Sequence, residues 1–129
     1  MNYAVFLGYG NRPDQALKET KNKQSKAEIS PVEWILLEHE LNLYSHQSED
    51  FAEKIVKAFK GGEIKKHRTG AHQAGFFVLV GSFMPAVLFE MGFITNQKDR
   101  KYMSSTKGQK DIASRLSKAI ADFFRAQKK

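Results

Sequence analysis

Glu90 has the residue type and the position best suited to chemistry, because it ends a short apolar run within the segment Gly75–Phe93. This segment contains two such runs, Phe76–Val80 and Ala86–Phe89, joined by Gly-Ser-Phe-Met-Pro. Runs of this length and composition predict strands buried on both faces of an α/β sheet. A buried carboxylate is costly unless it is paired, and α/β sheets hold their chemistry beyond the carboxyl ends of strands. Glu90 is therefore a candidate catalytic residue, and a structural ion pair with an arginine or lysine is the alternative.

The other residue types that commonly do chemistry form no catalytic set. His67 and His72 do not match the helical zinc motif, because they are five residues apart and no carboxylate lies between them. His39 is expected on a solvent-facing helix turn and His46 in a bend, so all four histidines are predicted to be surface residues. The chain has no cysteine, which excludes disulfides, thiolate zinc sites and a cysteine nucleophile. No Gly-rich phosphate loop and no nucleophile-elbow serine occurs.

The composition is that of one soluble globular domain, residues 1–129, with 41% hydrophobic and 27% charged residues. No apolar run approaches the roughly 20 residues of a membrane span, and the first residues do not have the pattern of a signal peptide. The net charge of +7 favours polyanionic partners such as nucleic acid, an acidic membrane surface or an anionic wall polymer. The alternative is that this charge serves solubility alone.

The elements expected in the first half of the chain are a strand, a loop and a helical region. Tyr3–Leu7 predicts a strand, and residues 14–30 predict a polar loop. Ser30, Pro31 and Glu33 form a capping box with proline at the first helical position, so a helix is expected to begin there. It continues to the glycine pair at 61–62, either as one long helix bent near residues 45–48 or as two helices.

The second half of the chain is expected to present a basic segment at the sheet rim. Residues 63–74 carry Lys65, Lys66 and Arg68, and they lead into the predicted strand Phe76–Val80. Arg68 is therefore a candidate substrate-binding residue. A polar turn at 94–100 predicts a short helix, and a last helix is expected from about residue 108. Its apolar stripe consists of Ile112, Leu116, Ile120, Phe123 and Phe124.

The residues around Glu90 resemble a known family. Residues 72–79, His-Gln-Ala-Gly-Phe-Phe-Val-Leu, and 84–96, Met-Pro-Ala-Val-Leu-Phe-Glu-Met-Gly-Phe-Ile-Thr-Asn, resemble the C-terminal half of the zinc-dependent N-acetylmuramoyl-L-alanine amidases, which are bacterial cell-wall hydrolases. In that family a Gln-Ala-Gly-Phe-x-Val-Leu strand precedes Met-Pro-x-Val-Leu-x-Glu-x-Gly-Phe-Ile-(Ser/Thr)-Asn. Residues 47–55 are similar to the family helix Ser-x-x-x-Ala-x-x-Ile, and 109–124 to its closing helix. Residues 4–7 are similar to the strand that follows its second zinc histidine.

The resemblance implies a fold and a reaction. The fold would be a partial three-layer α/β sheet flanked by helices, a truncated form of the amidase catalytic fold. The reaction would be hydrolysis of the amide between N-acetylmuramic acid and L-alanine of peptidoglycan, in the cell envelope, periplasmic or extracellular. In the family a zinc ion activates a water, and a glutamate at the strand end acts as general base and acid. By resemblance, that glutamate is Glu90.

The chain departs from the family at the metal ligands. The family has one zinc histidine in a Gly-His-Gly-Gly loop, a glutamate on the next helix and a second histidine in a Ser-x-His-x-Asn strand. None of these motifs occurs in this chain, so zinc is expected for the full family domain and no ligand is assigned here. The chain is interpreted as the C-terminal part of a longer amidase, or as a degenerate member that binds wall polymer without cutting it. In both cases this chain alone is predicted not to hydrolyse peptidoglycan.

Loss of the first strands of such a sheet predicts unpaired backbone edges near residues 3–7 and 78. Exposed edges and apolar surface favour pairing with another chain, so marginal stability and self-association through the sheet edge are expected.

A binding module would use Lys65, Lys66 and Arg68 to hold anionic glycan or the peptide stem. A nucleic-acid-binding function rests on charge alone, since the chain has no recognised motif and no basic-aromatic stripe.

Overall fold

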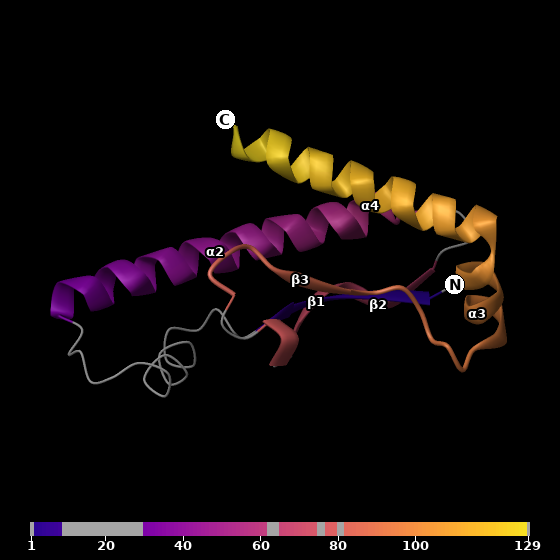
Figure 1. Cartoon of the computed structure of the whole chain (residues 1–129), viewed down its shortest axis with the longest axis horizontal. Coiled ribbons are helices and arrows are strands. Elements are labelled where there is room, and N and C mark those ends of the chain that lie inside the picture. Colours follow the sequence, from indigo (N-terminus) through magenta and orange to yellow (C-terminus); the bar gives the residue numbers. More distant parts are fainter. Residues whose placement is uncertain (1, 9–29, 62–64, 75–76, 80–81, 129) are drawn as a thin grey trace.

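A computed structural model describes residues 2–8, 30–61, 65–74, 77–79 and 82–128, and it confirms the α/β class predicted from the sequence. The strands are β1 (Asn2–Gly8), β2 (Lys65–Ala74) and β3 (Val87–Glu90). The α-helices are α2 (Pro31–Ala58), α3 (Gln97–Ser104) and α4 (Thr106–Gln127), and η2 (Phe77–Leu79) is a 3-10 turn. Figure 1 shows α2 and α4 lying along one side of the sheet, with α3 at its end.

The described sheet has the order β2-β1-β3, so the strand that comes first in the chain is central. β1 runs parallel to β2 and antiparallel to β3. Val5 lies opposite Ala71 of β2 and Phe89 of β3, and it is completely buried. The predicted strand Tyr3–Leu7 is thereby confirmed. The unpaired edge expected near residues 3–7 is wrong, because β1 pairs with a strand on each side.

Helix α2 is one continuous helix with the predicted start. The Ser30 hydroxyl accepts a hydrogen bond from the Glu33 backbone N–H at 3.2 Å, and the Glu33 carboxylate accepts one from the Ser30 N–H at 2.8 Å. These reciprocal bonds satisfy donors that a helix leaves unpaired at its N-terminus. Gly61 follows the helix with a φ of 84°, a conformation that favours glycine. The structure thus decides between one helix and two.

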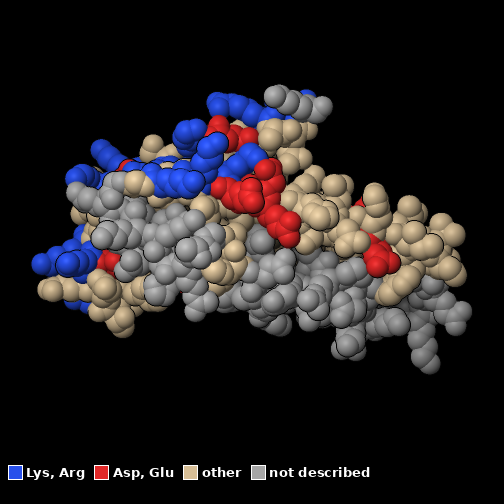
Figure 2. Space-filling model, turned by 180° about the vertical axis from the view of Figure 1, so that it is seen from behind, with Lys and Arg blue, Asp and Glu red and all other residues tan. Residues whose placement is uncertain are grey.

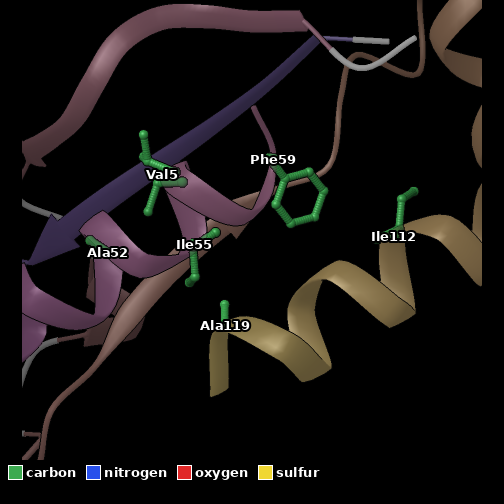
Figure 3. Packing of buried hydrophobic residues seen from close by; sticks show 7 residues of the cluster. Val5, Ala52, Ile55, Phe59, Ile112 and Ala119 are labelled. Atoms are coloured by element: carbon green, nitrogen blue, oxygen red, sulfur yellow. The ribbon is translucent and has the colours of Figure 1, made fainter. Parts of the chain in front are cut away.

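The hydrophobic core lies between the sheet, α2 and α4 (Figure 3). Val5 of β1 meets Ala52, Ile55 and Phe59 of α2, and α4 contributes its apolar side. The buried members of this cluster are Val5, Ala52, Ile55, Val56, Phe59, Ile112 and Ala119. The Phe59 ring packs on Phe89 of β3 at a centroid distance of 4.8 Å, which joins the strand bearing Glu90 to the core.

The predicted strand Phe76–Val80 is wrong for the part that the structure describes. Residues 77–79 form η2, and the strand is the preceding basic segment, β2. Val78 is 70% exposed whereas Leu79 is 7% exposed, so this run is not buried on both faces. A short apolar run does not distinguish a strand from a helical turn, and pairing with β1 selected the polar segment instead. Residues 75, 76, 80 and 81 lie outside the described residues.

The second apolar run is a strand, but it is half-buried rather than fully buried. Every residue of β3 is intermediate in exposure, because β3 lies at an edge of the described sheet with β1 as its neighbour. Glu90 is the last residue of this strand. The predicted loop at 14–30 lies outside the described residues except for Ser30. The last two helices are confirmed, although Ile120 and Phe124 of the predicted apolar stripe are 42% and 60% exposed.

Polar contacts tie α3 and α4 to the end of α2. Nη1 of Arg115 donates to the carbonyl oxygen of Ala58 at 3.0 Å, and the Arg115 guanidinium lies 5.9 Å from the centre of the Phe59 ring. A cation at a helix C-terminus is stabilised by the unpaired carbonyl groups there. Nε of Arg115 also donates to both carboxylate oxygens of Asp111 at 3.0 Å. The hydroxyl of Tyr102 donates to Oδ2 of Asp111 at 2.7 Å.

This network predicts a pH-dependent contribution to stability. The Tyr102 hydrogen bond, followed by Arg115, lowers the pKa of Asp111 below its ordinary value. The ionised carboxylate therefore stabilises the fold above the unfolded pKa of about 3.9, and this contribution is lost as the pH falls through the folded-state pKa. Tyr102→Phe is expected to lower the free energy of unfolding by about 1 kcal/mol at neutral pH. Urea unfolding at a series of pH values should show this difference shrinking in acid, and a pH-independent difference would contradict the assignment.

Candidate functional site

Glu90 lies at the end of β3, where Ala4 of β1 is its partner. Side chains alternate between the two faces of a sheet. Val5, Ala71 and Phe89 point to the face that α2 and α4 cover, since Val5 belongs to the core cluster and the other two pack against it. The opposite face, here called the site face, therefore presents Ala4, Phe6, His72, Leu88 and Glu90. Glu90 is thus turned away from the helices that stabilise its strand.

The loop after Glu90 is held by a glycine and a buried carboxylate. Gly92 has a φ of 154°, a backbone conformation that residues other than glycine rarely adopt. Asp99 is only 1% exposed, and its Oδ2 accepts a hydrogen bond from the Phe93 N–H at 3.0 Å. The Asn96 side chain accepts from the N–H groups of Lys98 and Asp99, which caps α3. These contacts anchor the loop that follows Glu90.

A second anchor holds the start of β3. Ser48 of α2 is 2% exposed, and its Oγ accepts a hydrogen bond from the Ala86 N–H at 2.9 Å while donating to the Tyr44 carbonyl at 2.7 Å. Ala86 is the residue immediately before β3. The serine of the helix pattern therefore positions the strand that carries Glu90. In the sequence Ser48 is recognisable only as part of the family helix pattern, which gives no sign of its contact with Ala86.

The register of β1 and β2 places the backbone of Arg68 across β1 from Glu90. Tyr3 pairs with Lys66 and Val5 pairs with Ala71, so residues 67–70 bulge out opposite Ala4, the partner of Glu90. Two strand spacings separate the outer strands, which is about 10 Å. The prediction that Arg68 lies near the rim therefore has a backbone basis. Its side chain lies outside the part of the chain that the structure describes.

His72 is the residue on the site face that sequence reasoning undervalued. Its ring lies 6.2 Å from that of Phe6, and its Nε2 atom is buried without a hydrogen-bond partner. A buried polar atom without a partner calls for an explanation, such as a bound water or ion. The surface prediction is confirmed for His39 and for His46, whose side chain is 81% exposed, and the His67 side chain is not described. For His72 the prediction holds only in part, because the residue is half-buried: the pairing of β2 turns its ring onto the site face with Nε2 buried.

The described residues do not fit a complete zinc site. A catalytic zinc needs three protein ligands, and no group of three His, Cys, Asp or Glu side chains converges within the part of the chain that the structure describes. His72 offers one imidazole nitrogen that could bind zinc. Glu90 lies on the same face, but it pairs with Ala4 of β1 whereas His72 pairs with Phe6. No chemical step is assigned to a metal on these residues. The helices of the described ranges also include none that is long and apolar enough to cross a membrane.

Comparison with known proteins places this geometry in a family. The family model for N-acetylmuramoyl-L-alanine amidase matches residues 11–122. The chain belongs to this amidase family. The match extends over the α2 anchor of Ser48, the β3 carboxylate and the closing helices, which are the features that hold Glu90 in place.

Curated relatives include two proteins named as N-acetylmuramoyl-L-alanine amidases and one, YqiI, named as uncharacterized. Amidase AmiA of Salmonella typhimurium is 33% identical over 60 residues, which are 46% of this chain and 21% of that protein. Amidase AmiC of Escherichia coli is 32% identical over 66 residues, which are 50% of this chain and 16% of that protein. YqiI of Bacillus subtilis is 34% identical over 55 residues, 43% of this chain and 27% of that protein. The chain thus matches about a quarter or less of the length of these relatives.

Proposed function

We propose that this chain is one partial catalytic domain, residues 1–129, of a zinc-dependent N-acetylmuramoyl-L-alanine amidase. The whole enzyme would cleave the amide between N-acetylmuramic acid and L-alanine in peptidoglycan, in the cell envelope. The observation that carries this proposal is Glu90, held on the site face of the sheet by the β1 pairing and the Asp99 loop, in a chain of the amidase family. Peptidoglycan is accordingly the proposed partner.

Glu90 would serve as general base and then as general acid. Its carboxylate would accept a proton from the attacking water and deliver it to the nitrogen of the leaving L-alanyl peptide. This role requires a carboxylate that reaches the substrate while its backbone stays fixed. The Ser48 bond to Ala86 and the Asp99 bond to Phe93 supply that fixation from both sides.

Arg68 would hold a carboxylate of the substrate's stem peptide. The bulge of residues 67–70 lies one strand beyond the partner of Glu90, so a substrate lying across β1 would reach both positions. Guanidinium groups recognise carboxylates through paired hydrogen bonds. Replacement of the arginine by lysine would keep the charge and lose this geometry.

The zinc ligands of the site would come from residues outside this sequence. The family zinc motifs are missing from this sequence, and the matched region is a small part of each relative. The ligands would then come from a further segment of the same protein or from a partner chain. That zinc-binding half would also supply the third layer, packed on the site face. The alternative function, a non-catalytic peptidoglycan-binding or degenerate amidase-like protein, shares the fold and lacks the metal.

The experiment that tests this proposal compares the chain alone with the chain supplied with the zinc-binding half of a family amidase. The purified, tag-free chain is expected to hold no stoichiometric zinc by elemental analysis and to release no stem peptides from purified peptidoglycan. Adding the zinc-binding half, fused or as a separate chain, is expected to give zinc-dependent release that a chelator abolishes.

Any of three results would overturn the proposal. Chelator-sensitive release by the chain alone would show that it contains its own metal site, with His72 and His67 as the first residues to replace. Retention on insoluble peptidoglycan without release, in both the chain alone and the combined form, would establish the non-catalytic alternative. Binding to DNA at moderate salt without binding to peptidoglycan would refute both.

A further inference from the structure

The N-terminal half of α2 carries an apolar stripe on the side opposite its buried residues. Val32, Ile35, Leu36 and Leu43 follow the spacing i, i+3, i+4 and i+11, which places them on one side of the helix. Their exposed fractions are 66%, 64%, 60% and 47%. We call these four residues the α2 stripe. Leu41, about half a turn away, is 1% exposed, so this part of the helix is apolar on two opposite sides. Helices of that kind are usually buried on both.

Helix α4 ends before it reaches the α2 stripe. Nε2 of Gln47 donates to Oε1 of Gln127 at 3.2 Å, so the last turn of α4 lies beside Gln47. Further along, α4 covers α2, with Phe51 and Phe123 in contact at a centroid distance of 4.9 Å. Residues 31–44 make up about 20 Å of helix before that end. Figure 1 shows this purple end of α2 projecting beyond α4. The α2 stripe therefore lies beyond the end of α4 and on the side of α2 away from the core, and no described helix covers it.

A matching surface lies on α4 itself. Ile120 and Phe124 are one turn apart on the same side of the helix, and they are 42% and 60% exposed. We call these two residues the α4 face. Lys128 follows Phe124 by one further turn. The face is apolar with a cation at its end. Gln127, in the same part of α4, contacts Gln47, one turn after Leu43 at the C-terminal end of the α2 stripe.

The helical regions that contain the two surfaces have opposite net charge. Residues 31–44 contain three glutamates and no lysine or arginine. Residues 97–128, which span α3 and α4, contain nine lysines or arginines and three aspartates, a net +6 of the chain's +7. Figure 2 shows this separation, with Lys and Arg gathered over α3 and α4 and the N-terminal half of α2 largely uncharged with scattered acidic residues. Opposite potentials favour association of the two surfaces and select between possible arrangements.

We propose that the α4 face of a second copy of this chain docks on the α2 stripe, in a two-fold symmetric dimer. Pairing of α2 with α2 would bring Glu33 and Glu40 of both copies together, whereas docking on α4 brings them towards Lys128. One contact of three helical turns is small against the roughly 800 Å² per partner of a stable interface. A two-fold axis repeats the contact, because each copy then offers both surfaces. The dimer does not depend on the chemistry proposed for Glu90.

Sedimentation velocity of the full chain over a wide range of concentration tests this dimer. The wild type is expected to shift from monomer to dimer. The double substitution Ile35→Glu with Leu36→Glu is expected to raise the dissociation constant at least about thirtyfold, as for residues at the centre of an interface. Ile94→Glu is the matched control, because Ile94 is 73% exposed in the loop after Glu90, outside both surfaces. A monomer at all concentrations, or equal effects of both variants, would overturn the proposal.

Disulfide trapping tests the arrangement, and the absence of native cysteine makes it specific. Ser117 precedes Ile120 by three residues on the same side of α4 and is exposed. A chain with Ile35→Cys mixed with a chain with Ser117→Cys is expected to give mainly the mixed disulfide. Predominant self-linking of the Ile35→Cys chain would instead show α2 paired with α2, and would refute docking on α4. Lys128→Glu should weaken the dimer, and Glu40→Lys should restore it.

Discussion

Replacing Glu90 with Gln in the zinc-loaded, combined enzyme is expected to lower the rate of stem-peptide release by about 10²–10⁴-fold. The amide has nearly the shape of the carboxylate but cannot accept the proton of the attacking water. Peptidoglycan binding should stay unchanged, because the substitution removes a proton acceptor rather than a contact surface. The measurement is the initial rate of release at saturating peptidoglycan, alongside retention on the insoluble polymer.

Two further variants sharpen this experiment. Glu90→Asp keeps the charge but withdraws the carboxylate by one methylene, so an intermediate rate is expected. Glu53→Gln removes an exposed carboxylate from α2, and it should leave the rate unchanged. Loss of zinc from the Glu90→Gln enzyme would contradict the assigned role, since it would make this residue a metal ligand. A rate within a few-fold of wild type would leave Glu90 as a structural strand-end carboxylate.

Phe59→Ala is expected to lower the free energy of unfolding by about 3–5 kcal/mol. Phe59 is 1% exposed and packs on Phe89, and the Arg115 guanidinium lies over its ring. Removing the ring leaves a cavity where α2, α4 and β3 meet. Small domains have a total stability of about 5–15 kcal/mol, so the variant should approach the limit of folding. Urea or thermal unfolding followed by circular dichroism measures the change.

The conservative control is Phe59→Leu, which refills most of the cavity and should cost clearly less. Val78→Ala removes an exposed apolar side chain and should change stability by no more than about 0.5 kcal/mol. Similar losses for Phe59→Ala and Val78→Ala would contradict the position of the core. If Phe59→Ala fails to fold, Phe59→Leu still tests the position of the core. A buried side chain should lose stability on this smaller truncation, whereas the exposed Val78 should not.

The helices could be predicted from the sequence because their signals are local. The capping box of Ser30 and Glu33 lies within one turn, and the apolar spacing of α4 repeats along one segment. The strand β2 could not be predicted, since its residues are polar and its pairing with β1 depends on a partner far away in the sequence. The apolar run after it offered a stronger local pattern, and three of its residues form a 3-10 turn instead.

Some residues of the candidate site could likewise be predicted from the sequence, and others could not. Glu90 could be found from its place at the end of an apolar run and from the motif around it. His72 could not, because its importance arises from a ring nitrogen that pairing and alternation bury without a partner. The contact of Ser48 with Ala86 joins residues from two elements, and only the packing of α2 on the sheet reveals it. Sequence patterns thus supplied residue types, and tertiary pairing decided which of them meet.

The order of the strands also constrains when the chain can fold. β1 is synthesised before both of its partners in the described sheet, Lys65–Ala74 and Val87–Glu90. Loops that close over such long separations are slow to form. Until the second half of the chain is made, the strand around Val5 therefore remains without its neighbours, exposed to chaperones and to other nascent chains. The time spent in that state, rather than the stability of the finished fold, would then limit the yield of soluble protein.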